Sequence, residues 1–361
     1  MAVSQVNLRY AMGVNMDQQD IILSAKDIEV KFDLRGQILT AIRGVSLDIY
    51  RGETLAIVGE SGSGKSVFTK TFNGLLDANG RISEGELLYH GENLAQYKKE
   101  KQWLKIRGHE IAMIMQEPMT SLNPLKTIGE QIVEAIRIRD KKLSFKEAKK
   151  EALGYLKEVG IKYPERRYGQ YPHEFSGGMR QRVVIAIAVA CKPKILICDE
   201  PTTALDVTIQ AQILKVLKEM KEKHSLTIIF ITHDLGVVAS VADRIAVMYA
   251  GDIIEIGMTE EIFFDPRHPY TWALLSSMPQ LGIKGEDLFS IQGNPPNLFT
   301  EIKGDAFAPR NPHALKIDYQ KRPPYFEVSA THKAKTWLLD PRAPKVEKPA
   351  GIVRLRELKA N

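Results

Sequence analysis

An eight-residue stretch, GESGSGKS at residues 59–66, limits the folds open to this chain more than any other feature. It fits the phosphate-binding pattern G-x-x-x-x-G-K-[ST] at every fixed position, and the apolar run TLAIV at 54–58 precedes it as a buried strand would. In such loops, glycines let backbone N–H groups surround phosphate oxygens, and the following helix adds the positive end of its dipole. The sequence therefore predicts an α/β fold that binds a nucleotide.

The residue types in the loop suit that use. Lys65 is placed to reach the β- and γ-phosphates, and the Ser66 hydroxyl is placed to ligate Mg²⁺. A glycine-rich turn with a chance lysine is the alternative, which the complete pattern between strand and helix disfavours. The loop alone does not identify the reaction, because GTPases, kinases and transport ATPases share it. The candidate nucleotide-binding residues of this loop are Gly59, Ser61, Gly62, Ser63, Gly64, Lys65, Ser66 and Val67.

Composition and cysteine use indicate a cytoplasmic protein. The net charge of +6 fits an anionic partner or membrane surface about as well as an ordinary solvated surface, and it supports no nucleic-acid claim. Cys191 and Cys198, both in apolar surroundings, are predicted to be buried reduced thiols. Residues 1–20 lack the pattern of a secretory signal, and the longest apolar run, at 183–191, is about half of what a bilayer crossing requires. If the protein works at a membrane, we expect another chain to cross it.

Alternating apolar residues predict an antiparallel β layer beside the phosphate loop. Residues 28–32 and 45–49 alternate in period two, and 86–89 is a further short strand candidate. Phe32 lies 27 residues before Gly59 and could stack on an adenine ring, although a core aromatic is the simpler interpretation of this residue alone.

Between about 100 and 190 the pattern becomes helical. Apolar spacing predicts a helix at 127–139, and Ser144 with Glu147 forms a capping box that opens another helix ending near residue 160. Ser176 is placed to cap a third helix, and Gly177 and Gly178 leave bare N–H groups at its start. These groups suit a second anion site, while a Ser-Gly-Gly helix start that binds nothing is the alternative.

Two later strands are predicted to end in acid–base side chains. The run ILICDE at 195–200 suits a buried parallel strand that delivers Asp199 and Glu200 to the edge of the sheet. Asp199 would hold Mg²⁺ through its water shell, and Glu200 would polarise the water that attacks the γ-phosphate. The strand at 228–231 ends near His233. A lone histidine at a strand end is more often structural, but this one follows the second core strand and faces the same edge. Residues 245–248 and 253–256 are predicted to close a hairpin.

Taken together, residues from about 22 to 257 resemble the nucleotide-binding subunit of an ATP-binding cassette (ABC) transporter. The 133 positions between Ser66 and Asp199 also disfavour small GTPases and adenylate-kinase-like enzymes. The motifs that carry the resemblance are GESGSGKS for Walker A, Gln116 for the Q-loop, FSGGMRQ for the signature, ILICDE for Walker B, 204–206 for the D-loop and His233 for the switch histidine.

The resemblance implies a dimer in which two chains share each ATP. In the family, one chain supplies Ser176, Gly177 and Gly178 to complete the ATP site of the other. The family also places an aromatic residue against adenine, and Phe32 is the matching position here. In the family, a short helix of a transmembrane subunit lies beside the Q-loop. Met113, Met115 and Met119 surround this loop and suit either an adaptable contact with that helix or simple core filling. The residues that the resemblance assigns to one ATP and its Mg²⁺ are Lys65, Ser66, Gln116, Asp199, Glu200 and His233.

The last hundred residues narrow the substrate class. They hold 12 of the 18 prolines and are expected to form a loop-rich module. The segments PRHPYT at 266–271 and GNPP at 293–296 resemble the extension of oligopeptide, dipeptide and nickel importers. Many relatives carry four cysteines there, but this chain has other residues, so no iron–sulfur cluster is expected. The residues at those positions are Asp305, Asn311, Asp318 and Thr336.

The expected organisation is an α/β P-loop ABC ATPase core with an antiparallel β subdomain and a helical subdomain, followed by the extension. We divide the chain into a flexible start at 1–20, the nucleotide-binding domain at 21–257 with its helical part at about 100–190, the extension at 258–338 and a mobile or partner-bound tail at 339–361.

The expected function is ATP hydrolysis, with Mg²⁺, that powers oligopeptide import. The expected partners are a second, related ABC ATPase, two transmembrane permeases and, indirectly, an extracytoplasmic peptide-binding protein, with the chain peripheral at the cytoplasmic face of the membrane. Nickel or dipeptide import is the alternative. A soluble ABC ATPase acting on nucleic acid is disfavoured by the single cassette and the lack of sustained heptads, and a non-hydrolysing regulatory module by Asp199, Glu200 and His233.

Overall fold

Two β-sheets form the centre of the protein, whose computed structural model describes residues 21–116, 121–203, 205–278 and 291–360. The first sheet is antiparallel, as its alternating sequence predicts, with the strand order β2–β1–β4–β5. Its strands extend beyond the strictly alternating runs, and residues 22–25 at the start of β1 form a continuous buried stretch. They are β1 (Ile21–Leu34), β2 (Gln37–Tyr50), β4 (Gly80–Tyr89) and β5 (Glu92–Asn93).

The second sheet carries the phosphate loop and has the order β11–β12–β10–β9–β3–β8–β7–β6. Strands β6 to β9 and β3 run parallel, and β3, β7 and β8 are buried along their whole length. The hairpin of β9 and β10 forms as predicted. The strands are β3 (Thr54–Val58), β6 (Ile111–Ile114), β7 (Ile195–Asp199), β8 (Thr227–Thr232), β9 (Arg244–Tyr249), β10 (Asp252–Met258), β11 (Phe326–Glu327) and β12 (Lys333–Ala334).

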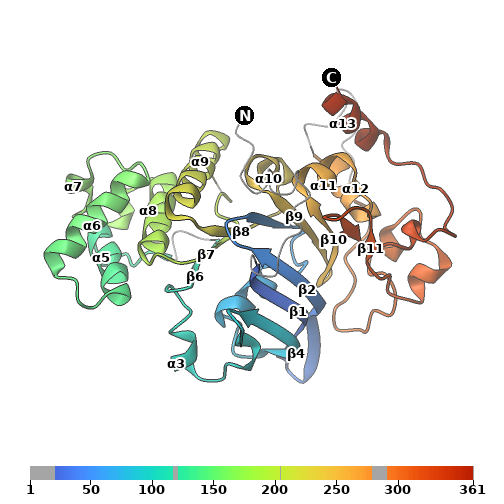
Figure 1. Cartoon of the computed structure of the whole chain (residues 1–361), viewed down its shortest axis with the longest axis horizontal. Coiled ribbons are helices and arrows are strands. Elements are labelled where there is room, and N and C mark those ends of the chain that lie inside the picture. The colour runs from blue at the N-terminus through green and yellow to red at the C-terminus, as the bar shows by residue number, and fades with distance from the viewer. Residues whose placement is uncertain (1–20, 117–120, 204, 279–290, 361) are drawn as a thin grey trace.

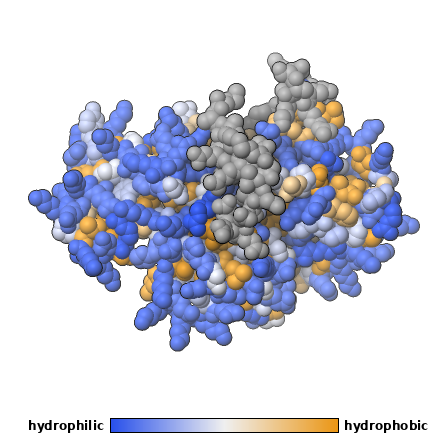
Figure 2. Space-filling view, in the orientation of Figure 1, coloured by the Kyte–Doolittle hydropathy of each residue, from blue (hydrophilic) through white to orange (hydrophobic). Residues whose placement is uncertain are grey.

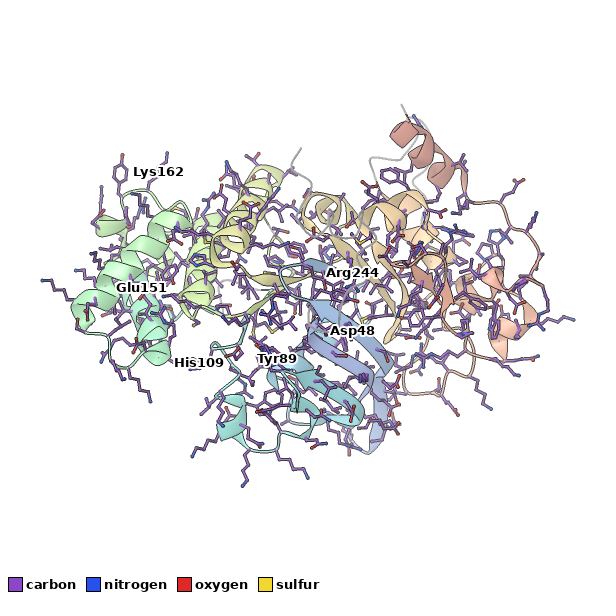
Figure 3. All side chains as sticks on the ribbon, in the orientation of Figure 1. Asp48, Tyr89, His109, Glu151, Lys162 and Arg244 are labelled. Carbon is purple, nitrogen blue, oxygen red and sulfur yellow. The ribbon has the colours of Figure 1, made fainter. Side chains whose placement is uncertain are left out.

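Apolar residues from both sheets make a shared core between them. Val30 and Leu47 of the antiparallel sheet belong to the same buried cluster as Ile57 and Ile229 of the parallel sheet. At the junction, Arg244 pairs with the fully buried Glu53. Arg244 also donates to the backbone oxygen of Asp48, and both of these residues are labelled in Figure 3. The two sheets are thus joined by both apolar packing and a buried ion pair.

The helices lie mainly to either side of the sheets (Figure 1). Helices α5, α6 and α7 form one end of the molecule, and α8 and α9 connect them to the parallel sheet (Figure 1). The capping box predicted at Ser144 opens α6, and a second capping box, at Thr127, opens α5. The helices before the extension are α2 (Lys65–Lys70), α3 (Glu100–Trp103), α5 (Ile128–Arg139), α6 (Phe145–Glu158), α7 (Pro164–Arg167), α8 (Gly177–Ala190), α9 (Val207–His224) and α10 (Leu235–Val241).

The predicted start of the helical subdomain, near residue 100, needs correction. Residues 111–114 form β6, which pairs in parallel with β7 inside the core sheet. Trp103 of α3 likewise packs into the core between the two sheets. A run of four apolar residues is too short to show whether its period is that of a strand or a helix, so the sequence did not separate β6 from its helical neighbours.

The extension packs against the edge of the core at β10. Helices α11 (Thr259–Phe264) and α12 (Pro269–Ser276) are followed by short segments, of which β12 pairs with β10 and so lengthens the core sheet. The loop-rich character is therefore as expected, but the module shares the main sheet. Short 3₁₀ turns occur at Ala308–Arg310, Lys316–Tyr319 and Trp337–Leu339.

The expectation of a mobile or partner-bound tail is wrong for its last part. Residues Ala350–Ala360 form α13, which packs against α11 and α12. Ile352 is fully buried there, and Val346 and Leu355 pack against the same cluster. Prolines and charged residues dominate the tail sequence, so its few apolar residues did not indicate that this segment packs against the extension.

Several other expectations concern the surface or undescribed parts. Of the two cysteines, Cys198 is buried, whereas Cys191 is only half-buried.

Figure 2 shows a largely hydrophilic face with separate apolar patches. In the part of the chain that the structure describes, no helix is both long and apolar enough to cross a bilayer. The predictions for residues 1–20, Met119 and position 204 lie outside the described residues.

Candidate nucleotide site

The phosphate loop connects β3 to α2 and is pressed against two neighbouring strands. A Cβ atom on Gly59 would lie 2.1 Å from the backbone oxygen of Met248 in β9. On Gly64, which has φ of +103°, it would lie 2.9 Å from Cδ1 of Ile42 in β2. Both positions therefore require glycine, because of the close approach and the left-handed backbone. This packing fixes the loop against the two sheets.

Lys65 lies inside the loop that it was predicted to serve. Its Nζ donates hydrogen bonds of 2.8 Å to the backbone oxygens of Gly59 and Glu60. Burial lowers the pKa of Lys65, while Glu200 and Asp199 act against that shift. The ammonium group is thus held within the loop, where the two carboxylates at the end of β7 act on its charge.

Ser66 and Asp199 meet as the sequence predicts. The Ser66 hydroxyl donates a hydrogen bond of 2.9 Å to Oδ1 of Asp199, at the end of β7. Burial raises the pKa of Asp199, and the Ser66 hydrogen bond acts in the opposite direction. A hydroxyl and a carboxylate oxygen are the hard ligands that Mg²⁺ prefers, and a nearby cation would relieve the cost of burying this carboxylate. The residues present therefore fit a Mg²⁺ ion.

Glu200 is the centre of the hydrogen-bond network at this edge. Gln116 Nε2 donates to Oε2 of Glu200 over 3.0 Å, and Nδ1 of His233 lies 3.1 Å from Oε1. Thr203 also donates to Oε2, over 2.9 Å. Glu200 itself has a φ of +46°, a left-handed conformation that is unfavourable for glutamate. Three groups from separate segments thus hold one strained residue.

The contacts of Glu200 favour its charged form. Burial acts to raise the pKa of Glu200, but the hydrogen bonds with His233 and Thr203, together with electrostatic attraction by His233 and Lys65, outweigh burial, and the pKa is lowered overall. An ionised carboxylate is the form that accepts a proton. Thr203 was not among the sequence candidates. Its only sequence signal is its place three residues after Glu200, in the turn that follows β7.

The signature residues stand apart from this network. Ser176 caps α8 by accepting a hydrogen bond of 3.4 Å from the Met179 N–H, as predicted. Ser176 and Gly177 are exposed, whereas a Cβ on Gly178 would lie 2.4 Å from Cγ2 of Ile209 in α9. Within the described residues, no hydrogen bond is seen between Ser176 and the phosphate loop. The two elements are therefore presented separately on this chain.

Phe32 and the methionines near Gln116 have mixed environments. Phe32 is 8% exposed and packs on Gly80, where a Cβ would lie 2.5 Å from the ring. This placement agrees with a core aromatic, and stacking on adenine stays a prediction. Met113 packs against the central core, whereas Met115 is 42% exposed. Of these two described methionines, Met115 is therefore the more accessible one beside Gln116.

The four residues at the cysteine positions of the extension are all buried. Each accepts a hydrogen bond from a nearby backbone N–H, so their side chains organise the loops around them. These oxygen and amide groups offer no thiolate for an iron–sulfur cluster. The pairs are Asp305 with Phe307, Asn311 with His313, Asp318 with Leu315 and Thr336 with Leu338.

Comparison with known proteins identifies the family. A family model described as "ABC transporter" matches residues 42–203, and one described as "Oligopeptide/dipeptide transporter, C-terminal region" matches 254–317. The oligopeptide transport ATP-binding protein AmiE of Streptococcus pneumoniae is 59% identical over 340 residues, which cover 94% of this chain and 96% of that protein. The chain belongs to the ABC transporter ATP-binding proteins. The resemblance inferred from the motifs is thereby confirmed.

Other members of the ABC family extend the match. The dipeptide transport ATP-binding protein DppD of Lactococcus lactis is 55% identical, covering 95% of this chain and 99% of that protein. OppD of Bacillus subtilis, an oligopeptide transport ATP-binding protein, is 55% identical over 93% and 94%. A dimeric ATP-binding cassette, MJ0796, solved with ADP and phosphate, aligns with a TM-score of 0.59 at 30% identity, covering 66% of this chain and 98% of that one. The predicted ABC fold is confirmed.

Proposed function

We propose that this ABC protein hydrolyses ATP to power the uptake of oligopeptides through separate permease subunits. The observation that carries the ATPase part is the Glu200 carboxylate, held in its charged form by His233 and Thr203 beside the pair of Ser66 and Asp199. The peptide part is supported by the C-terminal region at 254–317 and by relatives that are named for oligopeptide transport.

Each residue of the site has a role that follows from its contacts. Lys65 exchanges the backbone oxygens of the loop for the β- and γ-phosphates of ATP. Ser66, Asp199 and Gln116 would hold Mg²⁺, which when bound would neutralise charge on the phosphates. Glu200 accepts a proton from the attacking water, and His233 orients the carboxylate through its contact with Oε1. We propose that Phe32 stacks on the adenine.

The exposed signature suggests a site shared between two chains. Ser176 and Gly177 present the start of an apolar helix to solvent, and N–H groups there suit the γ-phosphate of an ATP held by a second cassette. We propose a related but different ATPase as this partner. Two membrane permeases complete the assembly at the cytoplasmic face, and a peptide-binding protein delivers the cargo from outside.

Peptide length separates the closest alternatives. DppD of Lactococcus lactis is named for dipeptide transport and is 55% identical to this chain, so a dipeptide cargo has specific support. Cargo choice in such an assembly rests with the subunits that contact the peptide. The cargo therefore has to be determined by measuring uptake through the whole importer.

Uptake of labelled peptides of graded length tests the proposal. Cells that lack redundant importers would carry wild-type chain, Glu200→Gln, or Glu219→Gln as a matched control on the exposed face of α9. We expect Glu200→Gln alone to abolish uptake of oligopeptides. If Glu200→Gln lost uptake of dipeptides or nickel but not of oligopeptides, the cargo would be a dipeptide or nickel instead. Unchanged uptake of all of these in Glu200→Gln would contradict the transport role.

A further inference from the structure

The C-terminal extension reaches directly into the phosphate loop at Glu60, the second residue of that loop. Arg310 donates two hydrogen bonds to the Glu60 carboxylate, of 2.7 Å to Oε2 and 3.0 Å to Oε1. The Tyr270 hydroxyl accepts a hydrogen bond of 2.8 Å from the Glu60 N–H. Both residues lie in the region matched by the oligopeptide and dipeptide transporter model. The extension therefore contacts the nucleotide site through one residue.

Arg310 is the rigid member of this pair. Its side chain is 4% exposed, compared with 26% for Glu60. It also donates to the backbone oxygens of Gln292 and Ile291 and to the Tyr249 hydroxyl. The hydrogen bonds with Glu60 raise the pKa of Arg310, so the guanidinium stays charged. A fixed, planar guanidinium thus sets the position of the Glu60 carboxylate.

The Glu60 carboxylate is a competitor for the lysine of the loop. Lys65 Nζ already donates to the Glu60 backbone oxygen, and the negative charge of Glu60 acts on the Lys65 ammonium. Within the described residues, the carboxylate pairs with Arg310 and not with Lys65. A carboxylate released from Arg310 would attract Lys65 and repel the negative phosphates of ATP.

We propose that Arg310 is a positioning residue for ATP binding: it holds and neutralises the Glu60 carboxylate, so that Lys65 remains available to the phosphates. The extension is then a working part of the nucleotide site and not only an appended module. Arg310 acts through Glu60 and does not itself touch ATP. The inference rests on the proposed ATP site, and it predicts that removing the Glu60 charge makes Arg310 dispensable for binding.

Four forms of the full-length chain test this arrangement through the dissociation constant for Mg-ATP, measured by titration calorimetry. They are wild type, Arg310→Gln, Glu60→Gln and the double variant. We expect Arg310→Gln to weaken ATP binding by about 10-fold, with kcat at saturating ATP within about 2-fold of wild type. Glu60→Gln alone and the double variant should both bind ATP within about 3-fold of wild type, because Tyr270 still holds the loop backbone.

A matched variant controls for loss of an arginine ion pair. Arg342 pairs with Asp340 in the same C-terminal part of the chain and is 85% exposed. Arg342→Gln should leave the dissociation constant unchanged. Thermal unfolding checks that each variant is folded. If Arg310→Gln is unfolded, Arg310→Lys replaces it, because lysine keeps a positive charge at this position. Arg310→Lys should bind ATP about 2- to 5-fold more weakly than wild type.

The possible results separate this inference from the wider proposal. Two results would each overturn the role of Arg310. The first is wild-type affinity for ATP in Arg310→Gln, or in Arg310→Lys if that variant replaces it. The second is a double variant that binds ATP as weakly as the damaged single variant. Failure of the wild-type chain itself to bind Mg-ATP would instead overturn the proposed ATP site. Rescue of ATP affinity by Glu60→Gln, when thermal unfolding shows that Arg310→Gln is itself stably folded, separates a charge effect on the nucleotide site from a merely structural salt bridge.

Discussion

The Nδ1 atom of His233 lies 3.1 Å from Oε1 of Glu200 and joins the ends of two neighbouring strands. Glu200 follows β7 and His233 follows β8, and these strands are paired in parallel. The Glu200 N–H also donates to the backbone oxygen of Ile231 in β8. The position of the candidate base is therefore set by the sheet itself, and the surrounding side chains adjust its charge.

Thr203→Val should shift the pH dependence of ATP hydrolysis. The Thr203 hydroxyl helps to lower the pKa of Glu200, so its loss raises that pKa. A general base loses activity as pH falls through its pKa, and the acid limb of kcat should therefore move to higher pH. Thr208→Val, an exposed position on α9, should leave the profile in place. An unmoved acid limb in Thr203→Val would show that this hydrogen bond does not tune the base.

Lys65→Ala should reduce ATP binding by about 100-fold or more. The variant removes the ammonium group that the loop holds through Gly59 and Glu60, and we propose that this group is the charge closest to the phosphates. Equilibrium binding of Mg-ATP measures the effect, with Lys101→Ala on the exposed face of α3 as the control. Binding at wild-type strength in Lys65→Ala would place the phosphates elsewhere.

Ser176→Ala should separate helix capping from assembly. Its capping hydrogen bond is long, at 3.4 Å, so we expect the free energy of unfolding to fall by about 1 kcal/mol or less. ATP-dependent association with a partner cassette should nevertheless weaken. Ser144→Ala removes a similar cap from α6 and should cost comparable stability without changing association. Equal association in both variants, measured by sedimentation, would exclude a role for Ser176 at the interface.

Ile352→Ala should loosen the tail helix. Ile352 is fully buried, and truncation of such a side chain costs about 2 kcal/mol or more. Amides of residues 350–360 should therefore exchange with solvent about 30-fold faster or more, because α13 opens locally. Val353→Ala, at a position 44% exposed, should change exchange little. Equal protection in the two variants would show that α13 is not held by Ile352.

Local signals explain which parts of the structure were predictable. The phosphate loop needs glycines at Gly59 and Gly64 because of contacts and φ angles that any such loop must adopt, so its pattern is visible within eight residues. The caps at Thr127 and Ser144 likewise depend on residues three positions apart. Alternating apolar and polar residues predicted the antiparallel strands, because one face of each strand is buried.

Contacts between distant segments explain what was missed. Glu60 and Arg310 are 250 residues apart, and neither has a sequence pattern that points to the other. The pairing of β12 with β10 joins two short segments whose strand character appears only when they meet. Thr203 lies in a turn, where threonine is ordinary, and its role depends on the left-handed backbone of Glu200. These features arise from packing and not from local preference.

Phosphate release by the full-length chain purified together with its partner cassette, with wild type compared against Glu200→Gln, tests the central claim most directly. Glutamine keeps the shape of the side chain but cannot accept the proton, so Mg-ATP should bind with little change while release falls by about 100-fold or more. The variant should also accumulate as an ATP-bound dimer with its partner cassette. Wild-type release from Glu200→Gln would show that another group activates the water and would contradict this account.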